Sequence, residues 1–264
     1  MRLSAIFKEI KNSARYYATS SSGEDFENKF IISLRNGGFS RINAGKNFEE
    51  AKKEIKKCEK NPIFQDEVYF QNILKNIKNK ILAKTSTELV QNPFKQFNDY
   101  FIYQPYGSQN FPDFLVFTKK YIIPIEIKFS QNHSGHDTKK LSSRPVWNSN
   151  LPKSNAIYLY AISGADTTFF KGSDVIDNDV IKILINYFKN LDKNTDSLNN
   201  ALSKYENNFG FYPYIRKAYE QKLEKSTYFE NGKKAIESYF SSKREQRENN
   251  VINFFERIEN ESDN

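Results

Sequence analysis

The chain has 264 residues, enough for one sizeable core, and its 38% of hydrophobic residues includes 23 Phe and 16 Tyr, which predicts an aromatic core. Its formal net charge of +8 favours a polyanionic partner, because basic side chains that neutralise phosphates release bound counterions. The single cysteine, Cys58, excludes an intramolecular disulfide framework and fits a reducing compartment. No apolar run approaches a membrane span, so the sequence predicts a cytoplasmic protein with no membrane partner.

The N-terminal part of the chain is predicted to be helical. Apolar side chains recur at helical spacing in residues 3–17 and 24–36. The helical pattern continues in residues 47–60 and 65–84, with Pro62 breaking it between them.

The middle of the chain is predicted to be rich in strands. Residues 100–103 form a strand candidate that leads into a polar loop at 104–110. Two apolar runs, 114–117 and 121–127, flank a Lys-Lys turn and indicate an antiparallel hairpin of buried strands.

The C-terminal part begins with a long polar stretch at 130–153 that has almost no periodicity. Strands are predicted at 155–162 and 167–170, and from residue 177 onward the pattern is helical, with its clearest interruption at 210–213. Helices on both sides of a central strand-rich block predict an α/β fold with a central mixed sheet flanked by helices.

Three charged residues stand at one end of the predicted hairpin: Asp113, Glu126 and Lys128. A two-residue turn pairs Thr118 with Tyr121 and places Asp113 opposite Glu126, with Cβ atoms roughly 5 Å apart, and a four-residue turn gives the same register. A three-residue or five-residue turn would shift that register by one. Because side chains alternate along a strand, Lys128 shares a face with Glu126.

Two opposed carboxylates in an apolar setting repel each other, which raises a carboxyl pKa or recruits a cation. Mg²⁺ takes one or two carboxylates and completes its coordination with water and phosphate oxygens. The sequence therefore predicts a metal site formed by Asp113, Glu126 and the backbone carbonyl of Ile127. Lys128 would stabilise developing charge on a phosphate or help to activate the attacking water. This is the chemistry of phosphodiester hydrolysis.

Pro112-Asp113, followed after twelve residues by Glu126-Ile127-Lys128, resembles the motif of the PD-(D/E)XK nuclease superfamily, and within it the type II restriction endonucleases. The motif covers a small part of the chain. The resemblance implies a restriction endonuclease-like core whose acidic pair binds Mg²⁺ and whose lysine assists attack on the scissile phosphate.

The segment 23–27 opens the predicted helix 24–36 and resembles the N-terminal helix of that nuclease core, whose glutamate often faces the active site. This likeness implies Glu27 as an additional catalytic residue, with Glu24 as the alternative. The chain departs from the pattern in that a predicted helical stretch, about 46–87, separates this helix from the hairpin.

The resemblance also implies the organisation of the whole protein. It predicts one restriction endonuclease-like domain over residues 1–264, with a catalytic core at about 98–175 and the helical segments 1–97 and 176–264 packed around it. Site-specific cleavage of both strands of duplex DNA implies a homodimer, and a restriction system implies a cognate DNA methyltransferase as a separate protein.

Two polar loops are predicted to contact DNA because they border the candidate catalytic residues. Amide, basic and aromatic side chains are suited to base edges, phosphates and stacking. The first loop offers Gln104, Ser108, Gln109 and Asn110, and the second offers Gln131, Asn132, His133, Lys139, Lys140, Arg144, Trp147, Asn148 and Asn150. The competing interpretation of the second loop is an ordinary exposed surface segment.

Other functions are compatible with parts of the sequence. A repair, Mrr-like or junction-resolving nuclease would share the same core. A non-catalytic basic DNA-binding protein would carry the hairpin charges as a solvated cluster, and a helical interaction module would leave their convergence unexplained. A zinc or His-Asn-His nuclease is disfavoured, because the only His and Cys residues are His133, His136 and Cys58.

Overall fold

The structure is a computed structural model, and it describes residues 2–42, 67–82, 89–93, 98–108, 110–130, 152–175, 178–205 and 243–263. The chain divides into two compact units. The first comprises Met1–Val146, Pro152–Val175 and Glu237–Asn264, and the second comprises Trp147–Leu151 and Ile176–Ile236. The single domain over 1–264 stays a prediction.

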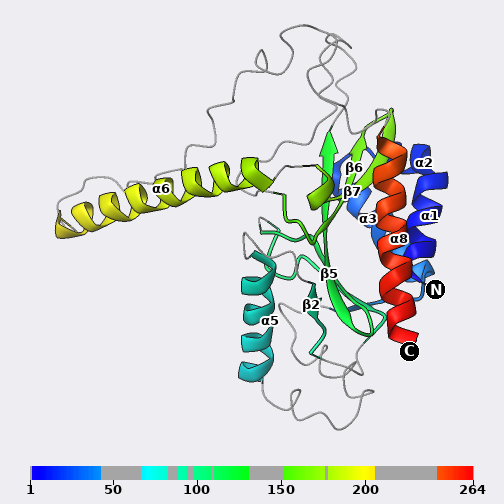
Figure 1. Cartoon of the computed structure of the whole chain (residues 1–264), viewed down its shortest axis with the longest axis horizontal. Coiled ribbons are helices and arrows are strands. Elements are labelled where there is room, and N and C mark those ends of the chain that lie inside the picture. Colours follow the sequence, from blue (N-terminus) through cyan, green and yellow to red (C-terminus); the bar gives the residue numbers. More distant parts are fainter. Residues whose placement is uncertain are drawn as a thin grey trace, which may run out of the picture. The chain divides into compact units, whose positions relative to one another are not determined.

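A mixed sheet of seven strands forms the centre of the first unit (Figure 1). Its strands are β1 (Ser40–Ile42), β2 (Val90–Gln91), β3 (Tyr100–Tyr103), β4 (Phe114–Phe117), β5 (Tyr121–Ser130), β6 (Ile157–Ile162) and β7 (Asp166–Lys171). They lie in the order β1-β3-β4-β5-β6-β7, and β2 pairs with the beginning of β5. The pairs β1–β3 and β5–β6 are parallel and the others are antiparallel. The predicted α/β fold with a central mixed sheet is confirmed.

The hairpin of β4 and β5 has the predicted register. The backbone N–H of Thr118 donates to the carbonyl of Tyr121 (2.9 Å), which closes a two-residue turn of exposed lysines. Phe114 pairs with Ile125 at the far end of the ladder. One step beyond that pair, the two candidate carboxylates stand opposite each other, as the sequence predicts.

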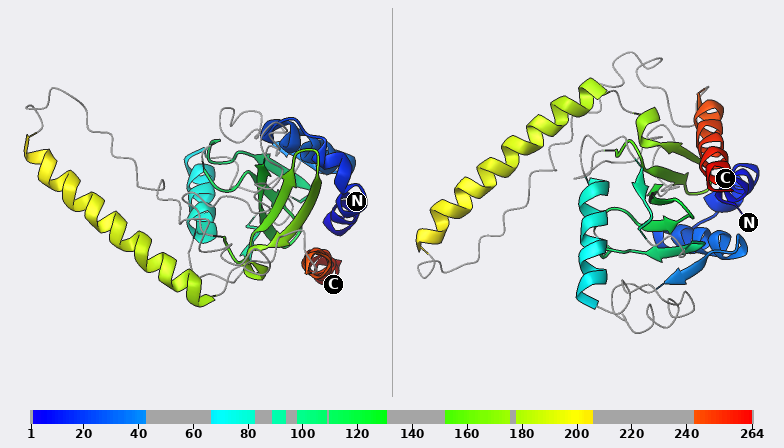
Figure 2. Two further views of the ribbon diagram at one scale, coloured as in Figure 1. Left: turned by 90° about the horizontal axis from the view of Figure 1, so that it is seen from above. Right: turned by 60° about the horizontal axis from the view of Figure 1, so that its bottom comes forward.

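Helices flank the sheet (Figures 1 and 2). They are α1 (Leu3–Asn12), α2 (Ala14–Ala18), α3 (Gly23–Asn36), α5 (Glu67–Leu82) and α8 (Arg244–Asp263), with a short 3₁₀ turn, η4 (Gly172–Asp174), after β7. The blue helix α3 covers one face of the sheet, and the cyan helix α5 lies beside the opposite face. The N-terminus of α3 is capped by Ser22, whose hydroxyl accepts from the N–H of Asp25 (3.1 Å).

The structure differs from the sequence prediction in two respects. The helix predicted over 3–17 is divided at Ser13, whose backbone (φ −111°, ψ 26°) leaves the helical region. The short strands β1 and β2 were not predicted, and both lie outside the range 98–175 indicated for the core. Helix α5 falls within the predicted helix 65–84, whereas the helix predicted over 47–60 lies outside the described residues.

The core between the sheet and its helices is aromatic, as predicted. The ring of Phe7 meets Phe169 of β7 edge to face and Phe255 of α8, with ring centroids 4.9 Å apart in each pair. Phe30 of α3 meets Phe114 of β4 edge to face at 5.1 Å. All five rings are fully buried, and each such pair contributes about 1 kcal/mol beyond its buried area. These contacts fix α3 over the hairpin strands.

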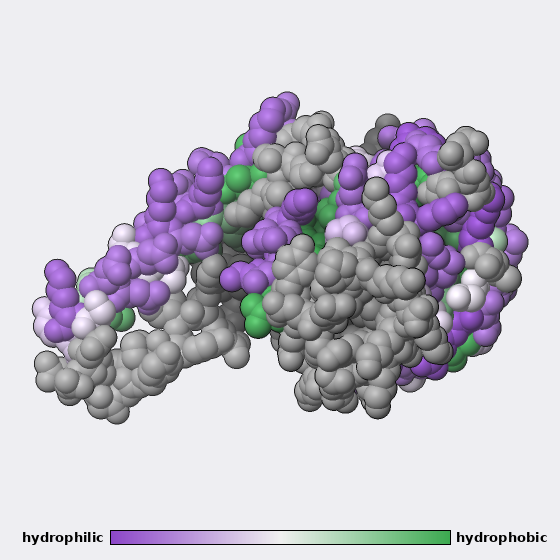
Figure 3. Space-filling model, turned by 90° about the horizontal axis from the view of Figure 1, so that it is seen from below, coloured by the Kyte–Doolittle hydropathy of each residue, from purple (hydrophilic) through white to green (hydrophobic). Residues whose placement is uncertain are grey.

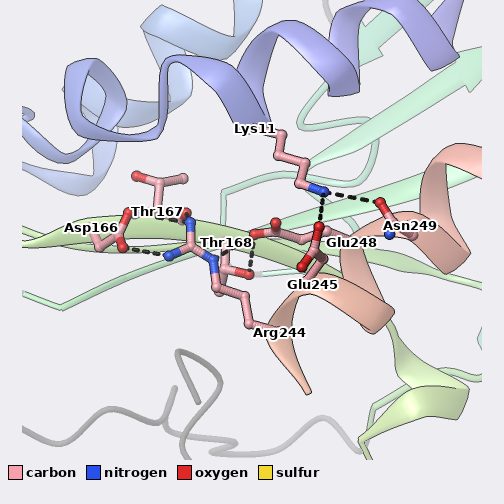
Figure 4. A network of polar contacts seen from close by, with 8 residues as sticks. All are labelled: Lys11, Asp166, Thr167, Thr168, Arg244, Glu245, Glu248 and Asn249. Atoms are coloured by element: carbon pink, nitrogen blue, oxygen red, sulfur yellow. Dashed lines mark hydrogen bonds and ion pairs between the residues drawn. The ribbon is translucent and has the colours of Figure 1, made fainter. Parts of the chain in front are cut away.

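A cluster of charged and polar side chains attaches α8 to β7 (Figure 4). The guanidinium of Arg244 donates to Asp166 and, at 2.8 Å, to Glu248. Glu248 in turn accepts from the hydroxyl of Thr168 (2.7 Å). Lys11 of α1 extends the contacts to the next turns of α8, where it meets Glu245 and Asn249. This cluster therefore joins the C-terminal helix to both the sheet and α1.

In the second unit, the described residues form α6 (Asn178–Leu202) and the 3₁₀ turn η5 (Ser203–Tyr205). Exposed apolar side chains of α6, among them Val180, Ile183 and Tyr187, recur at helical spacing. The described surface in Figure 3 is otherwise mostly hydrophilic, with apolar side chains in small separate patches. Among the described helices, none has both the length and the apolar composition needed to cross a membrane.

Candidate active site

The candidate site begins where the β4–β5 ladder ends. The backbone N–H of Ile127 donates to Oδ2 of Asp113 (2.7 Å), and the backbone N–H of Asp113 donates to Oε2 of Glu126 (3.2 Å). Each carboxylate thus accepts a hydrogen bond from the main chain of the other strand. The two contacts take the place of ladder bonds beyond Phe114 and fix both acids at the end of the hairpin.

Lys128 lies next to Glu126 on the same face of β5, as alternation predicts. Its Nζ donates to Oε1 of Glu126 at 2.6 Å. The carboxylate side chain is 7% exposed, whereas the lysine side chain is 25% exposed. The ammonium group therefore lies between a buried acid and solvent.

Helix α3 contributes Glu27 to the same region. The hydroxyl of Tyr103, the last residue of β3, donates to Oε2 of Glu27, and it accepts from Nε2 of Gln104 (2.8 Å). The backbone N–H of Gln104 donates to the carbonyl of Asp113 (2.7 Å), which ties the end of β3 to β4. Glu24, the alternative named from the sequence, is exposed, whereas Glu27 is only partly exposed.

Crowding of acids dominates the electrostatics of the site. Burial, followed by the charge of Glu126, raises the pKa of Asp113 well above its ordinary value, and the hydrogen bond from Ile127 and the charge of Lys128 only partly oppose this. Burial also raises the pKa of Glu27, with a further contribution from Glu126. Burial and the neighbouring carboxyl groups therefore both disfavour the ionised forms of Asp113 and Glu27 in the absence of a cation.

The hydroxyl of Tyr103 stays protonated in this environment. Burial, and then its hydrogen bond to Glu27, raise the pKa of Tyr103. The phenol therefore acts as a fixed hydrogen-bond donor toward Glu27.

The ligands available here fit Mg²⁺ better than they fit a metal ion that needs three or more side-chain ligands. In the described part of the chain, His, Cys, Asp and Glu nowhere gather in a group of three or more that could hold a metal ion. The site instead offers Asp113, Glu126 and one carbonyl. The N–H of Ile127 points toward Asp113, and its carbonyl points to the same edge, since both groups of a strand residue face one side. Mg²⁺ is commonly held by one or two carboxylates and substrate phosphate. The crowding of carboxyl groups also favours a cation here.

Some polar side chains of the loop 104–110 form hydrogen bonds within the protein. The side-chain amide of Gln104 faces Tyr103, and that of Asn110 donates to the carbonyl of Tyr106 (2.8 Å). Ser108 and Asn110 are exposed, and Gln109 lies outside the described residues. The DNA contacts of this loop stay a prediction.

The second predicted DNA-binding loop lies outside the described residues. This holds for Gln131, Asn132, His133, Lys139, Lys140, Arg144, Trp147, Asn148 and Asn150.

Two side chains near the site were not predicted from the sequence. Tyr103 links Glu27 to Gln104, and the guanidinium of Arg41 stacks on the ring of Tyr103 at 5.0 Å from its centre. Both belong to strands that pair in parallel, β1 and β3, and β1 is too short to show a pattern. The sequence feature that could have indicated Tyr103 is its position at the end of a predicted strand, just before the candidate loop.

No protein-family model, curated protein or solved structure matches this chain. What the protein does must therefore be inferred from its own residues.

Proposed function

We propose that the protein is a Mg²⁺-dependent, site-specific endonuclease of the type II restriction kind, which hydrolyses phosphodiester bonds in double-stranded DNA on a PD-(D/E)XK core. The observation that carries the proposal is the reciprocal contact of Asp113 and Glu126 with Lys128 beside them. Two acids and a lysine at the end of one hairpin match the order and spacing of the motif in the sequence.

The acidic residues would hold the metal, together with the carbonyl of Ile127. Mg²⁺, when bound, would supply positive charge at the phosphate and make a water molecule easier to deprotonate. Asp113 and Glu126 are already oriented by backbone N–H groups, so they lose little freedom when they bind a cation. This prior orientation is what a catalytic site requires of its ligands.

Lys128 would act on the phosphate itself. Its Nζ, paired with Glu126, can donate to the phosphate oxygens on which negative charge develops. Glu27, held by Tyr103, would orient the attacking water from the side of α3. The protein would cut both strands of a duplex site as a homodimer, with a separate methyltransferase protecting the host DNA.

The decisive experiment is to incubate the purified protein with a sequenced plasmid and Mg²⁺, and to map the ends of the products. The proposal predicts discrete fragments that disappear when a chelator is added. Fragments without a shared end sequence would favour the repair or junction-resolving alternative. Binding of intact DNA that is equal with Mg²⁺ and with chelator would favour the non-catalytic DNA-binding protein and contradict the proposal.

A further inference from the structure

Arg41 lies close to the candidate site, and no ion pair joins it to a carboxylate among the residues that the structure describes. It lies on β1 opposite Phe101 of β3, and it is partly buried. Its Nε is buried and has no hydrogen-bond partner in the described part of the chain. An unpaired buried donor on a charged group costs free energy, so a structural arginine normally has an acidic or carbonyl partner.

The side chain of Arg41 is held in place by stacking. Its guanidinium carbon lies 5.0 Å from the centre of the Tyr103 ring, and the hydroxyl of the same ring donates to Glu27. Because β1 and β3 run in parallel, their carboxyl ends lie on the same side of the sheet. On that side the backbone N–H of Gln104 donates to the carbonyl of Asp113. One tyrosine therefore separates the guanidinium from the acidic residues of the site.

A phosphate fits this arrangement. The guanidinium group stays charged at all physiological pH values, stacks on aromatic rings and binds phosphate with two parallel hydrogen bonds. The neighbouring carboxylates repel an approaching polyanion, so a fixed cation beside them would offset that repulsion where the nucleic acid must come close. The ring of Tyr103 separates Arg41 from the acidic residues. The guanidinium would therefore meet a phosphate next to the one that is cleaved.

We infer that Arg41 binds a backbone phosphate next to the phosphate that is cleaved, and thereby positions the DNA strand over Asp113 and Glu126. This inference rests on the proposed nuclease function. Arg41 would be a binding residue and not a catalytic one, because Tyr103 stands between it and the acids.

The test measures DNA binding apart from cleavage. A short fluorescent DNA duplex is titrated with the protein in the presence of a chelator, at several salt concentrations, for the wild type and Arg41→Ala. We expect about tenfold weaker binding for Arg41→Ala at low salt. The slope of log affinity against log salt should become shallower by about 0.9, the value for one lost phosphate contact. With Mg²⁺, KM should rise while kcat changes little.

Arg257 supplies a matched control. It also stacks on an aromatic ring, Phe254 (5.9 Å), but it lies on α8 and has Glu261 as an acidic partner (3.9 Å). Arg257→Ala should leave both the affinity and the salt slope unchanged. Arg41→Met keeps the apolar stem of the side chain, and it replaces Arg41→Ala in the comparison if thermal unfolding shows that the alanine variant is not folded.

The outcomes separate this inference from the proposed function. If the wild type binds and cuts DNA while Arg41→Ala and Arg41→Met retain its affinity and salt slope, Arg41 has no phosphate contact and the inference alone is overturned. If the wild type binds no DNA at any salt concentration, the proposed function fails and the inference fails with it.

Discussion

The sheet carries two clusters of buried acids, and they differ in how their charge is balanced. At the α8 attachment, Glu248 is 2% exposed and accepts from the guanidinium of Arg244 and the hydroxyl of Thr168. At the hairpin end, Glu126 is also buried and accepts from Lys128 and from a backbone N–H, with further carboxyl groups nearby. The first cluster is a satisfied network, and the second is crowded with like charges.

The pKa shifts express the same contrast. Burial lowers the pKa of Arg244, but its hydrogen bonds to Asp166 and Glu248 outweigh burial and raise it overall, so the attachment cluster favours its charged state. At the hairpin end, burial and Glu126 raise the pKa of Asp113, so that cluster disfavours its own charge. The acids of the attachment cluster are neutralised by partners, whereas the crowded acids of the hairpin cluster are those for which we propose a bound cation.

The largest effect is expected from removing one charge of the hairpin cluster. Asp113→Asn keeps the size of the side chain and an oxygen that can accept from Ile127, but it removes a candidate metal ligand. We expect cleavage to fall by more than about a thousandfold while DNA binding persists, because a metal contributes several kcal/mol to stabilising the transition state. Single-turnover cleavage at saturating Mg²⁺ measures this. Wild-type rates would exclude Asp113 from the site.

A somewhat smaller loss is expected for the lysine of the same cluster. Lys128→Ala should slow the chemical step by about a hundredfold or more, because a charge-stabilising donor at the phosphate is lost. Lys128→Arg should restore little, since the planar guanidinium does not occupy the position of a compact ammonium beside Glu126. Burst-phase kinetics distinguish the chemical step from product release. A Lys128→Ala protein that turns over like the wild type would show that the lysine only neutralises Glu126.

The attachment cluster should respond in stability and not in chemistry. Glu248→Ala removes one acidic partner of Arg244 and the acceptor of the Thr168 hydroxyl, so we expect a loss of about 2 kcal/mol in the free energy of unfolding. Denaturant titration followed by circular dichroism measures that loss. The cleavage rate of the folded fraction should stay within about twofold of the wild type. A large loss of cleavage without a loss of stability would contradict the distinction between the two clusters.

The sequence could predict those parts of the fold whose signals are local. The hairpin followed from two apolar runs around a short turn, and its register followed from counting outward from that turn. The short strands β1 and β2 have three and two residues, too few to show alternation. The break at Ser13 was missed because apolar residues continue at helical spacing on both sides of it.

The candidate site shows the same limit. Asp113, Glu126 and Lys128 lie within one hairpin, so their proximity follows from the register of neighbouring strands. The positions of Arg41 and Tyr103 depend on the parallel pairing of β1 with β3, which joins segments far apart in the sequence. Such pairing is decided by packing of the whole sheet, and no local pattern reports it.

The last effect concerns how the stability of the metal-free protein depends on pH. Asp113 has a higher pKa in the folded chain than in the unfolded chain, where it is about 4, so the folded state binds this proton more tightly. Its contribution to the free energy of unfolding is therefore lost as the pH rises from about 4 toward the raised folded pKa, by at most about 1.4 kcal/mol per pH unit. In Asp113→Asn, the free energy of unfolding should decrease less steeply as the pH rises. Mg²⁺ should make the decrease less steep in the wild type. Glu27, whose pKa is also raised, keeps part of the slope in the variant. Denaturant titrations of both proteins across this pH range test this prediction, and identical slopes would show that burial and Glu126 do not raise the pKa of Asp113 in the folded protein.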